Sequence, residues 1–278
     1  MKLYYVTSSS EAYTNALNER GLYNQLRSFY FLKTPKSRLL INRDHDLIDS
    51  GGFSARINGA VINVSEYANF LNEYGIKLAF NLDTKDEQET INNQFYLDSN
   101  CPNTYIIPVY HVSDYVRDEY RPLLEYYMYL GYEYIGIGGV AGAKNNKEQE
   151  IRFYNYIFNR TGNKIRLHGL GITSEKILRS YPWYSCDSSS FLAPAQFASM
   201  KTQSNEMSKV MAKTKHYVDR VMVDISYWVG LQDRMTRLWA NRGFSWEEAN
   251  IEELISKRNQ VQLNNKLSFE EWKQQNGF

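Results

Sequence analysis

The stretch Leu47-Ile48-Asp49-Ser50-Gly51-Gly52-Phe53 places a carboxylate at the end of a short apolar run, followed by a hydroxyl, two glycines and an aromatic ring. Glycine accepts a positive φ and lets the backbone pass close to a ligand. At the end of a buried strand, this stretch would offer a carboxylate, backbone donors and a stacking ring to a flat polar molecule. The same pattern is typical of a plain strand-to-helix turn with an aspartate N-cap, so the rest of the chain must decide.

Runs of strand length and segments of helix length alternate along the chain. The strand candidates are Leu3–Thr7, Leu47–Asp49, Lys77–Asp83, Thr104–His111, Tyr134–Gly138, Ile165–Gly169 and Trp183–Asp187. The helix candidates between them are Glu11–Phe29, Ser65–Tyr74, Lys85–Tyr96, Asp114–Leu130, Lys147–Asn159 and Ser174–Arg179. This alternation predicts parallel βαβ units, which build either a closed (β/α)₈ barrel or an open doubly wound sheet.

Two features favour the barrel. No Gly-x-Gly-x-x-Gly fingerprint follows the first strand, where a dinucleotide-binding sheet carries one. Residues suited to chemistry end many different strands, namely Asp49, Asp83, His111, Gly138, Gly139, His168 and Asp187. A barrel gathers all its strand ends on one face, where catalytic residues collect. We therefore predict an α/β fold of the TIM (β/α)₈ type over residues 1–200, although the eighth strand is not evident.

The pattern becomes helical after Asp187. Tyr217–Ala240 is rich in apolar residues, and both Ser245-Trp246-Glu247-Glu248 and Ser268-Phe269-Glu270-Glu271 have the form of a capping box. We predict that residues 201–278 form a helical C-terminal extension packed on the barrel. Five basic residues against two acidic ones lie between Lys201 and Arg220. This segment could contact phosphates of a nucleic acid, or it could be a solvated helix face.

The composition is that of an ordinary soluble protein: 278 residues, 43% hydrophobic, with a formal net charge of +1. No apolar run approaches the roughly 20 residues needed to span a membrane, and Met1–Val6 has the character of a first strand, without the apolar core of a signal peptide. Two cysteines and four scattered histidines argue against a disulfide framework and a structural zinc site. We expect a cytoplasmic protein that uses no metal and no cofactor.

The strand-end aspartates could each be purely structural. Asp83 could cap the helix that follows it, and the serines after Asp187 suit an N-cap or an Asx turn. Three aspartates on one barrel face are harder to explain by capping, because buried like charges repel and push their pKa values apart. Such an arrangement therefore favours a chemical role.

Two carboxylates across a pocket suit the chemistry of a glycosidic bond. One attacks the anomeric carbon, and the other handles the proton of the leaving group. A third aspartate can accept hydrogen bonds from the N–H groups of a heterocycle. The glycines of Gly136–Gly142 would expose backbone groups to a planar ligand; the alternative, a phosphate-binding loop, is weak because no Lys-Ser/Thr pair follows.

These residues, in this order, resemble a known family. Asp49-Ser50-Gly51-Gly52-Phe53 resembles the Asp-Ser-Gly-Gly-Phe signature of the queuine and archaeosine tRNA-guanine transglycosylases, which are TIM barrels. Asp83 matches their base-recognising aspartate, and Gly136–Gly142 is similar to their Ile-Gly-Gly-Leu/Val base-binding loop. Leu167–Thr173 resembles their Met-Gly-Val-Gly-Thr segment, and Asp187 falls where their nucleophilic aspartate lies. The resemblance covers roughly residues 40 to 195.

The departures from the family pattern concern the polynucleotide. Members that act on tRNA carry a Cys-x-Cys-x-x-Cys…His zinc subdomain after the nucleophile, whereas no cysteine follows Cys186 in this chain. The family's Gln-Gly-Gly is replaced by Val109–Val112, so His111 could supply that base contact. Asp187-Ser188-Ser189-Ser190 is more similar to the sequence of phage and bacterial DNA-guanine transglycosylases, which insert 7-deazaguanines into DNA.

The resemblance implies a glycosyltransferase, more narrowly a pentosyltransferase, that exchanges guanine in DNA for a free 7-deazaguanine such as 7-cyano-7-deazaguanine. Asp187 would attack C1′ and Asp49 would act as general acid and base. The implied substrate-binding residues are Ser50, Gly51, Gly52, Phe53, Asp83, His111, Gly138, Gly139 and His168. The enzyme would work in the cytoplasm, that of the host if a phage encodes it. The alternatives are the same exchange on tRNA, a non-catalytic family member that binds nucleic acid, and a glycosidase acting on an ordinary sugar.

Overall fold

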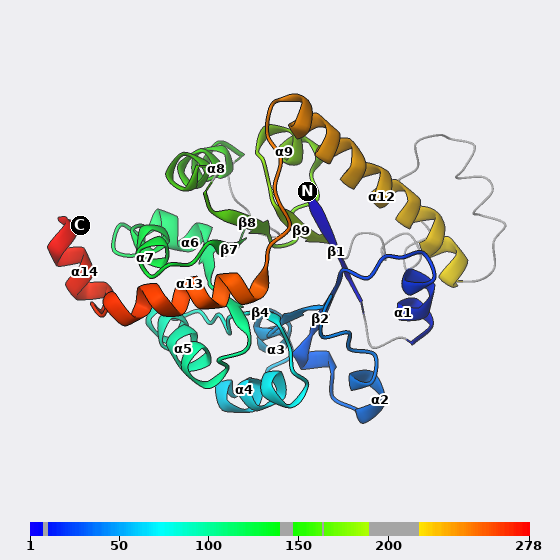
Figure 1. The fold of residues 1–278 in the computed structure, drawn as a ribbon, viewed down its shortest axis with the longest axis horizontal. Helices are drawn as coiled ribbons and strands as arrows, with labels where there is room; N and C mark the ends of the chain where they lie inside the picture. Colours follow the sequence, from blue (N-terminus) through cyan, green and yellow to red (C-terminus); the bar gives the residue numbers. More distant parts are fainter. Residues whose placement is uncertain (8–10, 140–146, 163, 189–216) are drawn as a thin grey trace.

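The computed structural model describes residues 1–7, 11–139, 147–162, 164–188 and 217–278. Over these ranges the chain is an α/β protein in which a single parallel sheet curls into a nearly closed barrel surrounded by helices (Figure 1). The described strands are β1 (Lys2–Val6), β2 (Gln25–Ser28), β3 (Leu47–Asp49), β4 (Leu78–Phe80), β5 (Tyr105–Ile107), β6 (Val109–His111), β7 (Tyr134–Gly138), β8 (Arg166–Gly169) and β9 (Ser185–Ser188).

The sheet runs in the order β5-β4-β3-β2-β1-β9-β8-β7-β6, and every neighbouring pair is parallel. Its two outer strands, β5 and β6, are consecutive in the sequence and only Pro108 separates them. The Pro108 carbonyl oxygen accepts a hydrogen bond of 2.8 Å from the backbone N–H of Gly136 on β7. The sheet therefore comes close to joining its own edges. The described part of the chain has nine strands, where the sequence predicted a (β/α)₈ barrel.

Helices follow most strands. They are α1 (Glu11–Asn18), α2 (Pro35–Arg38), α3 (Gly52–Ile57), α4 (Val64–Glu73), α5 (Glu87–Asn100), α6 (Val112–Val116), α7 (Leu123–Tyr129), α8 (Lys147–Thr161) and α9 (Glu175–Ser180), with a 3₁₀ turn, η1, at Phe29–Phe31. The strands are buried on both faces, as expected where helices cover a parallel sheet. Prolines divide two predicted elements, because a proline ring cannot donate a backbone hydrogen bond: Thr104–His111 is split at Pro108, and Asp114–Leu130 is split before Pro122.

The strand that the sequence analysis did not identify is β2. It lies inside the segment predicted as the helix Glu11–Phe29, so that prediction is wrong beyond Asn18. The helix ends in a turn in which Gly21 has φ of 71° and its N–H donates to the Asn18 carbonyl oxygen. The β2 side chains of Gln25 and Arg27 are polar yet buried, and Arg27 is paired with the buried Asp46 at 2.6 Å. A strand whose inward side chains are charged lacks the apolar signal that identifies strands.

In the described part of the C-terminal region, residues 217–278, three helices pack on the barrel: α12 (Tyr217–Asn241), α13 (Ile251–Asn264) and α14 (Phe269–Asn276) (Figure 1). Buried side chains from all three helices join the main apolar core. The predicted capping box at Ser268 is present, and its hydroxyl accepts from the N–H of Glu271 at 3.3 Å. The one predicted at Ser245 is wrong. The neighbouring Trp246 instead donates to the Pro182 carbonyl oxygen, and the helix begins only at Ile251.

The helices in the described ranges include none that is long and apolar enough to cross a bilayer.

Candidate active site

Three aspartates lie at the carboxyl ends of strands or just beyond them. Asp49 is the last residue of β3, Asp83 follows β4 by three residues, and Asp187 is near the end of β9. Because the strands are parallel, these ends face the same opening of the barrel. The sequence prediction that chemically suited residues share one end of the barrel therefore agrees with the topology.

Asp49 is half-buried, and its carboxyl group interacts electrostatically with the other two aspartates. Burial, followed by the negative charges of Asp83 and Asp187, raises its pKa to about 7. A hydrogen bond of 3.0 Å from the backbone N–H of Gly51 and the charge of Arg56 only partly oppose this increase. A carboxyl group with such a pKa exchanges a proton readily near neutrality, as a general acid or base must.

The residues after Asp49 form a turn that leads directly into α3. Gly51 has φ of 78°, and a Cβ there would collide with the side chains of Ser28 and Tyr30. A Cβ at Gly52 would lie 2.9 Å from the backbone oxygen of Asp83. Both glycines are therefore required for the close approach of this turn to the neighbouring strand ends.

Ser50 and Phe53 differ in what they offer to a ligand. Ser50 is fully buried, and its hydroxyl accepts a hydrogen bond of 3.3 Å from the backbone N–H of Gly52. Phe53, on the first turn of α3, is 66% exposed. The Ser50 hydroxyl thus stabilises the turn, while the Phe53 ring is accessible for a stacking contact.

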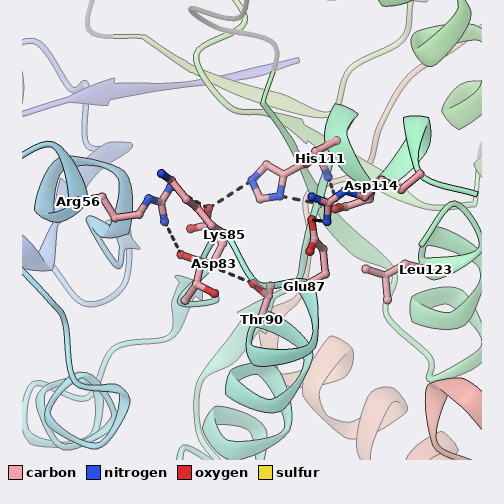
Figure 2. A pocket seen from close by; sticks show the side chains of 11 residues that line it. Arg56, Asp83, Lys85, Glu87, Thr90, His111, Asp114 and Leu123 are labelled. Carbon is pink, nitrogen blue, oxygen red and sulfur yellow. Dashed lines mark hydrogen bonds and ion pairs between the residues drawn. The ribbon is translucent and has the colours of Figure 1, made fainter. Parts of the chain in front are cut away.

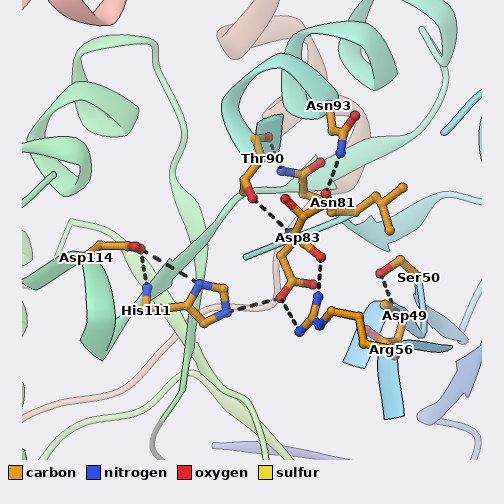
Figure 3. A network of polar contacts seen from close by, with 12 residues as sticks. Asp49, Ser50, Arg56, Asn81, Asp83, Thr90, Asn93, His111 and Asp114 are labelled. Atoms are coloured by element: carbon orange, nitrogen blue, oxygen red, sulfur yellow. Dashed lines mark hydrogen bonds and ion pairs between the residues drawn. The ribbon is translucent and has the colours of Figure 1, made fainter. Parts of the chain in front are cut away.

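Asp83 is held as a carboxylate by two basic side chains (Figure 3). His111 Nε2 lies 3.3 Å from Asp83 Oδ2, and a guanidinium nitrogen of Arg56 lies 4.0 Å from the same oxygen. Burial alone would raise the pKa of Asp83, but the hydrogen bond and charge of His111, with the charge of Arg56, lower it overall. In return, Asp83 raises the pKa of His111 against the opposing effect of burial.

The alternative in which Asp83 caps the next helix is not what the structure has. The N-cap of α5 is Asp86, whose Oδ1 accepts from the backbone N–H of Glu89 at 2.8 Å. The carboxylate of Asp83 instead points toward His111 and Arg56 (Figure 3). It is therefore free of a helix-capping role.

His111 is fixed from its other side by Asp114. The Asp114 carboxylate accepts from the His111 backbone N–H at 2.7 Å and lies 3.8 Å from its Nδ1. Burial raises the pKa of Asp114 to about 6, although the charge of His111 opposes it. On a third side, Gly138 makes room for the ring, because a Cβ there would lie 2.8 Å from His111 Cδ2. Gly138, which was predicted to expose its backbone to a ligand, thus leaves space for the His111 ring.

A pocket of about 320 Å³ opens beside this pair (Figure 2). Its lining is mainly charged or polar and includes Arg56, Asp83, Lys85, Glu87, His111, Asp114 and Arg117. Arg117 is paired with Glu87, and His111 lies between Asp83 and Asp114. Asp49 and Asp187 are not among the lining residues. The pocket therefore lies beside Asp83, which is the one strand-end aspartate among its lining residues.

Asp187 is nearly buried and receives two hydrogen bonds on one oxygen. Its Oδ1 accepts from the backbone N–H of Gly171 at 2.8 Å and lies 3.1 Å from His168 Nε2. These donors come from β8 and the turn after it, whereas Ser189 and Ser190, which follow in the sequence, lie outside the described residues. His168 itself is completely buried, and its side chain contacts Asp187.

Parts of the predicted site lie outside the described residues. Gly139 has φ of 77° at the end of β7, but residues 140–142 of the predicted base-binding loop are not described. The basic segment from Lys201 is described only from residue 217 onward, so its proposed phosphate contacts stay a prediction. Within the described ranges, no group of three or more His, Cys, Asp or Glu side chains is placed to hold a metal ion.

Three residues of the site were not identified from the sequence. Arg56 reaches Asp83 from one helical turn beyond Gly52, and Asp114 lies three residues after His111, where a capping-box partner is expected. Both spacings are visible in the sequence. The N–H of Gly171 had no such signal, because backbone donors become specific only through the fold. Comparison with family models and with curated proteins finds no match to this chain.

Proposed function

We propose that this protein is a DNA-guanine transglycosylase, which exchanges guanine in DNA for a free 7-deazaguanine base through a covalent aspartyl-glycosyl intermediate. The observation that carries the proposal is that three neighbouring aspartates differ, two of them in their pKa values and the third in its hydrogen bonds. Asp49 has a pKa of about 7, Asp83 is held as an anion, and Asp187 is oriented by two N–H donors. A base exchange needs one proton carrier, one acceptor for the base and one nucleophile.

In the first half of the reaction, Asp187 attacks C1′ of the target nucleotide. The bond from C1′ to N9 of guanine breaks, and its electron pair goes to the base. Asp49 delivers the proton that neutralises the departing base, which its pKa near 7 suits. The product of this step is a glycosyl ester of Asp187 with free guanine.

In the second half, the incoming 7-deazaguanine reverses the same events. Its N9 attacks C1′, the ester bond breaks, and the electron pair returns to Asp187. Asp49, now deprotonated, takes the N9 proton, so the enzyme ends in its starting state. No metal or redox cofactor takes part in this balance.

Asp83 is the group best suited to read the base. His111 and Arg56 both lie toward its Oδ2, which leaves Oδ1 to accept from the N–H edge of a guanine-like ring. Guanine and 7-deazaguanine share that edge, so one acceptor serves both halves of the exchange. Phe53 is exposed on the first turn of α3, and in this proposal its ring stacks on the base. Flipping a base out of a duplex costs about a few kcal/mol, which such contacts offset.

If β5 and β6 are counted as one strand interrupted at Pro108, the described strands number eight, which is the number in a (β/α)₈ barrel of the proposed family. DNA is preferred to tRNA as the polynucleotide because the sequence has no cysteine after Cys186 with which to build a zinc subdomain. The exchange of guanine in tRNA is the alternative that the same site would allow.

Trapping the covalent intermediate tests the proposal. The wild-type protein should form a denaturation-resistant adduct with a guanine-containing DNA oligonucleotide, and Asp187→Asn should form none. Asp118→Asn is the matched control, because Asp118 is a highly exposed aspartate on the protein surface. An adduct of wild-type yield with Asp187→Asn would show that the nucleophile is another residue. An adduct with tRNA but not with DNA would select the alternative.

A further inference from the structure

His168 has no role in the reaction as described above, yet among the described residues its side chain is in direct contact with the nucleophile. Its side chain is fully buried, and Nε2 lies 3.1 Å from Asp187 Oδ1. The N–H of Gly171 ends on the same oxygen. Within the described residues, both of these donors end on Oδ1 and none ends on Oδ2.

Two hydroxyl groups continue this contact inside the barrel. Ser185 Oγ lies 2.8 Å from His168 Nδ1, and the hydroxyl of Tyr134 lies 2.6 Å from Ser185 Oγ. Serine and tyrosine are both fully buried. Burial, with the neighbouring Tyr4 and Tyr184, raises the pKa of Tyr134 well above its usual value, so its hydroxyl keeps its proton and can donate.

An ionised carboxylate only accepts hydrogen bonds, so the contact with Asp187 places the ring proton of His168 on Nε2. If Tyr134 donates to Ser185, the serine hydrogen is free to donate to Nδ1 of His168. Nδ1 is then an acceptor, and the ring proton lies on Nε2, where it donates to Asp187. The rings of Phe80 and Tyr4, at 5.0 and 5.8 Å from the imidazole, surround it with an apolar environment that keeps water away from this arrangement.

We propose that His168 is a positioning residue for Asp187: held as the Nε2–H tautomer by Ser185 and Tyr134, it fixes Oδ1 and leaves Oδ2 as the attacking oxygen. The kinetic consequence rests on the proposed function. As Oδ2 bonds to C1′ and the C1′–N9 bond breaks, Oδ1 becomes the carbonyl oxygen of the ester and keeps both N–H donors. When the incoming base attacks, the C1′–Oδ2 bond breaks and the same donors stabilise the carboxylate that re-forms.

The tautomer can be measured without any substrate. Protein labelled with ¹⁵N-histidine gives ring nitrogen shifts that separate the Nε2–H form, the Nδ1–H form and the imidazolium, and loss of one set of signals in His168→Gln assigns them. We expect the Nε2–H form for His168. A Nδ1–H form or an imidazolium would overturn the assignment. Because this measurement uses the wild-type protein, it stands whether or not the variants fold.

The kinetic arm compares two substitutions of the same residue. Glutamine retains an N–H donor toward Asp187, whereas leucine has none. Since misplacement of a reacting group by about 1 Å can cost about 100-fold in rate, His168→Leu should form the DNA adduct about 100-fold more slowly. His168→Gln should recover about tenfold of that loss, with DNA affinity unchanged in both variants. Equal rates for the leucine variant and the wild type would overturn the proposal.

The two levels of the proposal can fail separately. If the wild-type protein forms no adduct with either DNA or tRNA, the proposed function is wrong. The ring nitrogen shifts then decide alone whether His168 orients Asp187, since that arrangement does not depend on the identity of the substrate.

Discussion

Replacing Asp49 with asparagine should remove a pH-dependent loss of stability from the protein. The pKa of Asp49 is raised from 3.8 to about 7, first by burial and then by the charges of Asp83 and Asp187. Between these two pH values the folded protein holds a proton that the unfolded chain releases. The free energy of unfolding therefore falls as pH rises through this window and levels off above about pH 7.

The size of the effect follows from the shift. Each unit of pKa difference is worth about 1.4 kcal/mol, so the full shift corresponds to about 4 kcal/mol. Asp49 is only half-buried, and solvent screening lowers this value, so we expect about 1 to 3 kcal/mol. Asparagine preserves the shape of the side chain and carries no charge at any pH.

Urea unfolding of the wild type and of Asp49→Asn, measured from pH 4 to pH 8, gives the comparison. The difference in free energy of unfolding should change in favour of the variant as pH rises, and most of the change should occur below pH 7. Asp44→Asn is the control. The Asp44 side chain is exposed, so this variant should show no such trend. Parallel curves for Asp49→Asn and wild type would refute the reasoning that burial and the neighbouring carboxylates raise the pKa of Asp49.

Two further predictions concern the contact between Asp83 and His111, and a third concerns the packing of α13. Gly138→Ala places a Cβ 2.8 Å from His111 Cδ2, so the ring must move relative to Asp83, the proposed acceptor for the base. A hydrogen bond to a charged group is worth about 1.5 kcal/mol, so binding of free 7-deazaguanine, measured by calorimetry, should weaken about tenfold. Unchanged affinity would contradict the account. His111→Gln removes the cation that lowers the pKa of Asp83, so the loss of base binding as pH falls should begin at a higher pH than in the wild type; an unshifted profile would count against Asp83 as the base acceptor. Arg258→Ala removes the guanidinium that pairs with the buried carboxylate of Asp98 at 2.6 Å. The free energy of unfolding, measured in urea, should fall by about 3 to 5 kcal/mol. A decrease below about 1 kcal/mol would show that the pair does not hold α13 on the barrel.

The fold could be predicted where apolar patterning is strong. β3 and β7 are short and mainly apolar, and their predicted bounds are those of the structure. β2 was missed because it buries Arg27 against Asp46, so a charged side chain occupies a position where the pattern expects an apolar one. The division of the strand at Pro108 was readable from the sequence, since proline cannot donate a ladder hydrogen bond, but its position at the closing edge of the sheet was not.

The candidate site could be predicted at the level of residue types at strand ends. Asp49, Asp83 and Asp187 are visible as carboxylates after apolar runs, and the parallel topology alone brings those ends together. Their different electrostatic states could not be predicted. The state of Asp83 depends on Arg56 and His111, and that of Asp49 depends on how deeply the turn at Gly51 is buried. The expected contact of His168 with the substrate stays a prediction. Its contact with Asp187 could not be predicted, because it depends on the register that pairs β8 with β9.

The central claim, base exchange at the three aspartates, is tested most directly by mass spectrometry of the nucleosides released after the protein is incubated with 7-cyano-7-deazaguanine and either DNA or tRNA. We predict that the 7-deazaguanine nucleoside appears in DNA, that it is absent with Asp187→Asn, and that it appears with Asp118→Asn as with the wild type. Unmodified nucleosides in both DNA and tRNA after incubation with the wild-type protein would contradict the account.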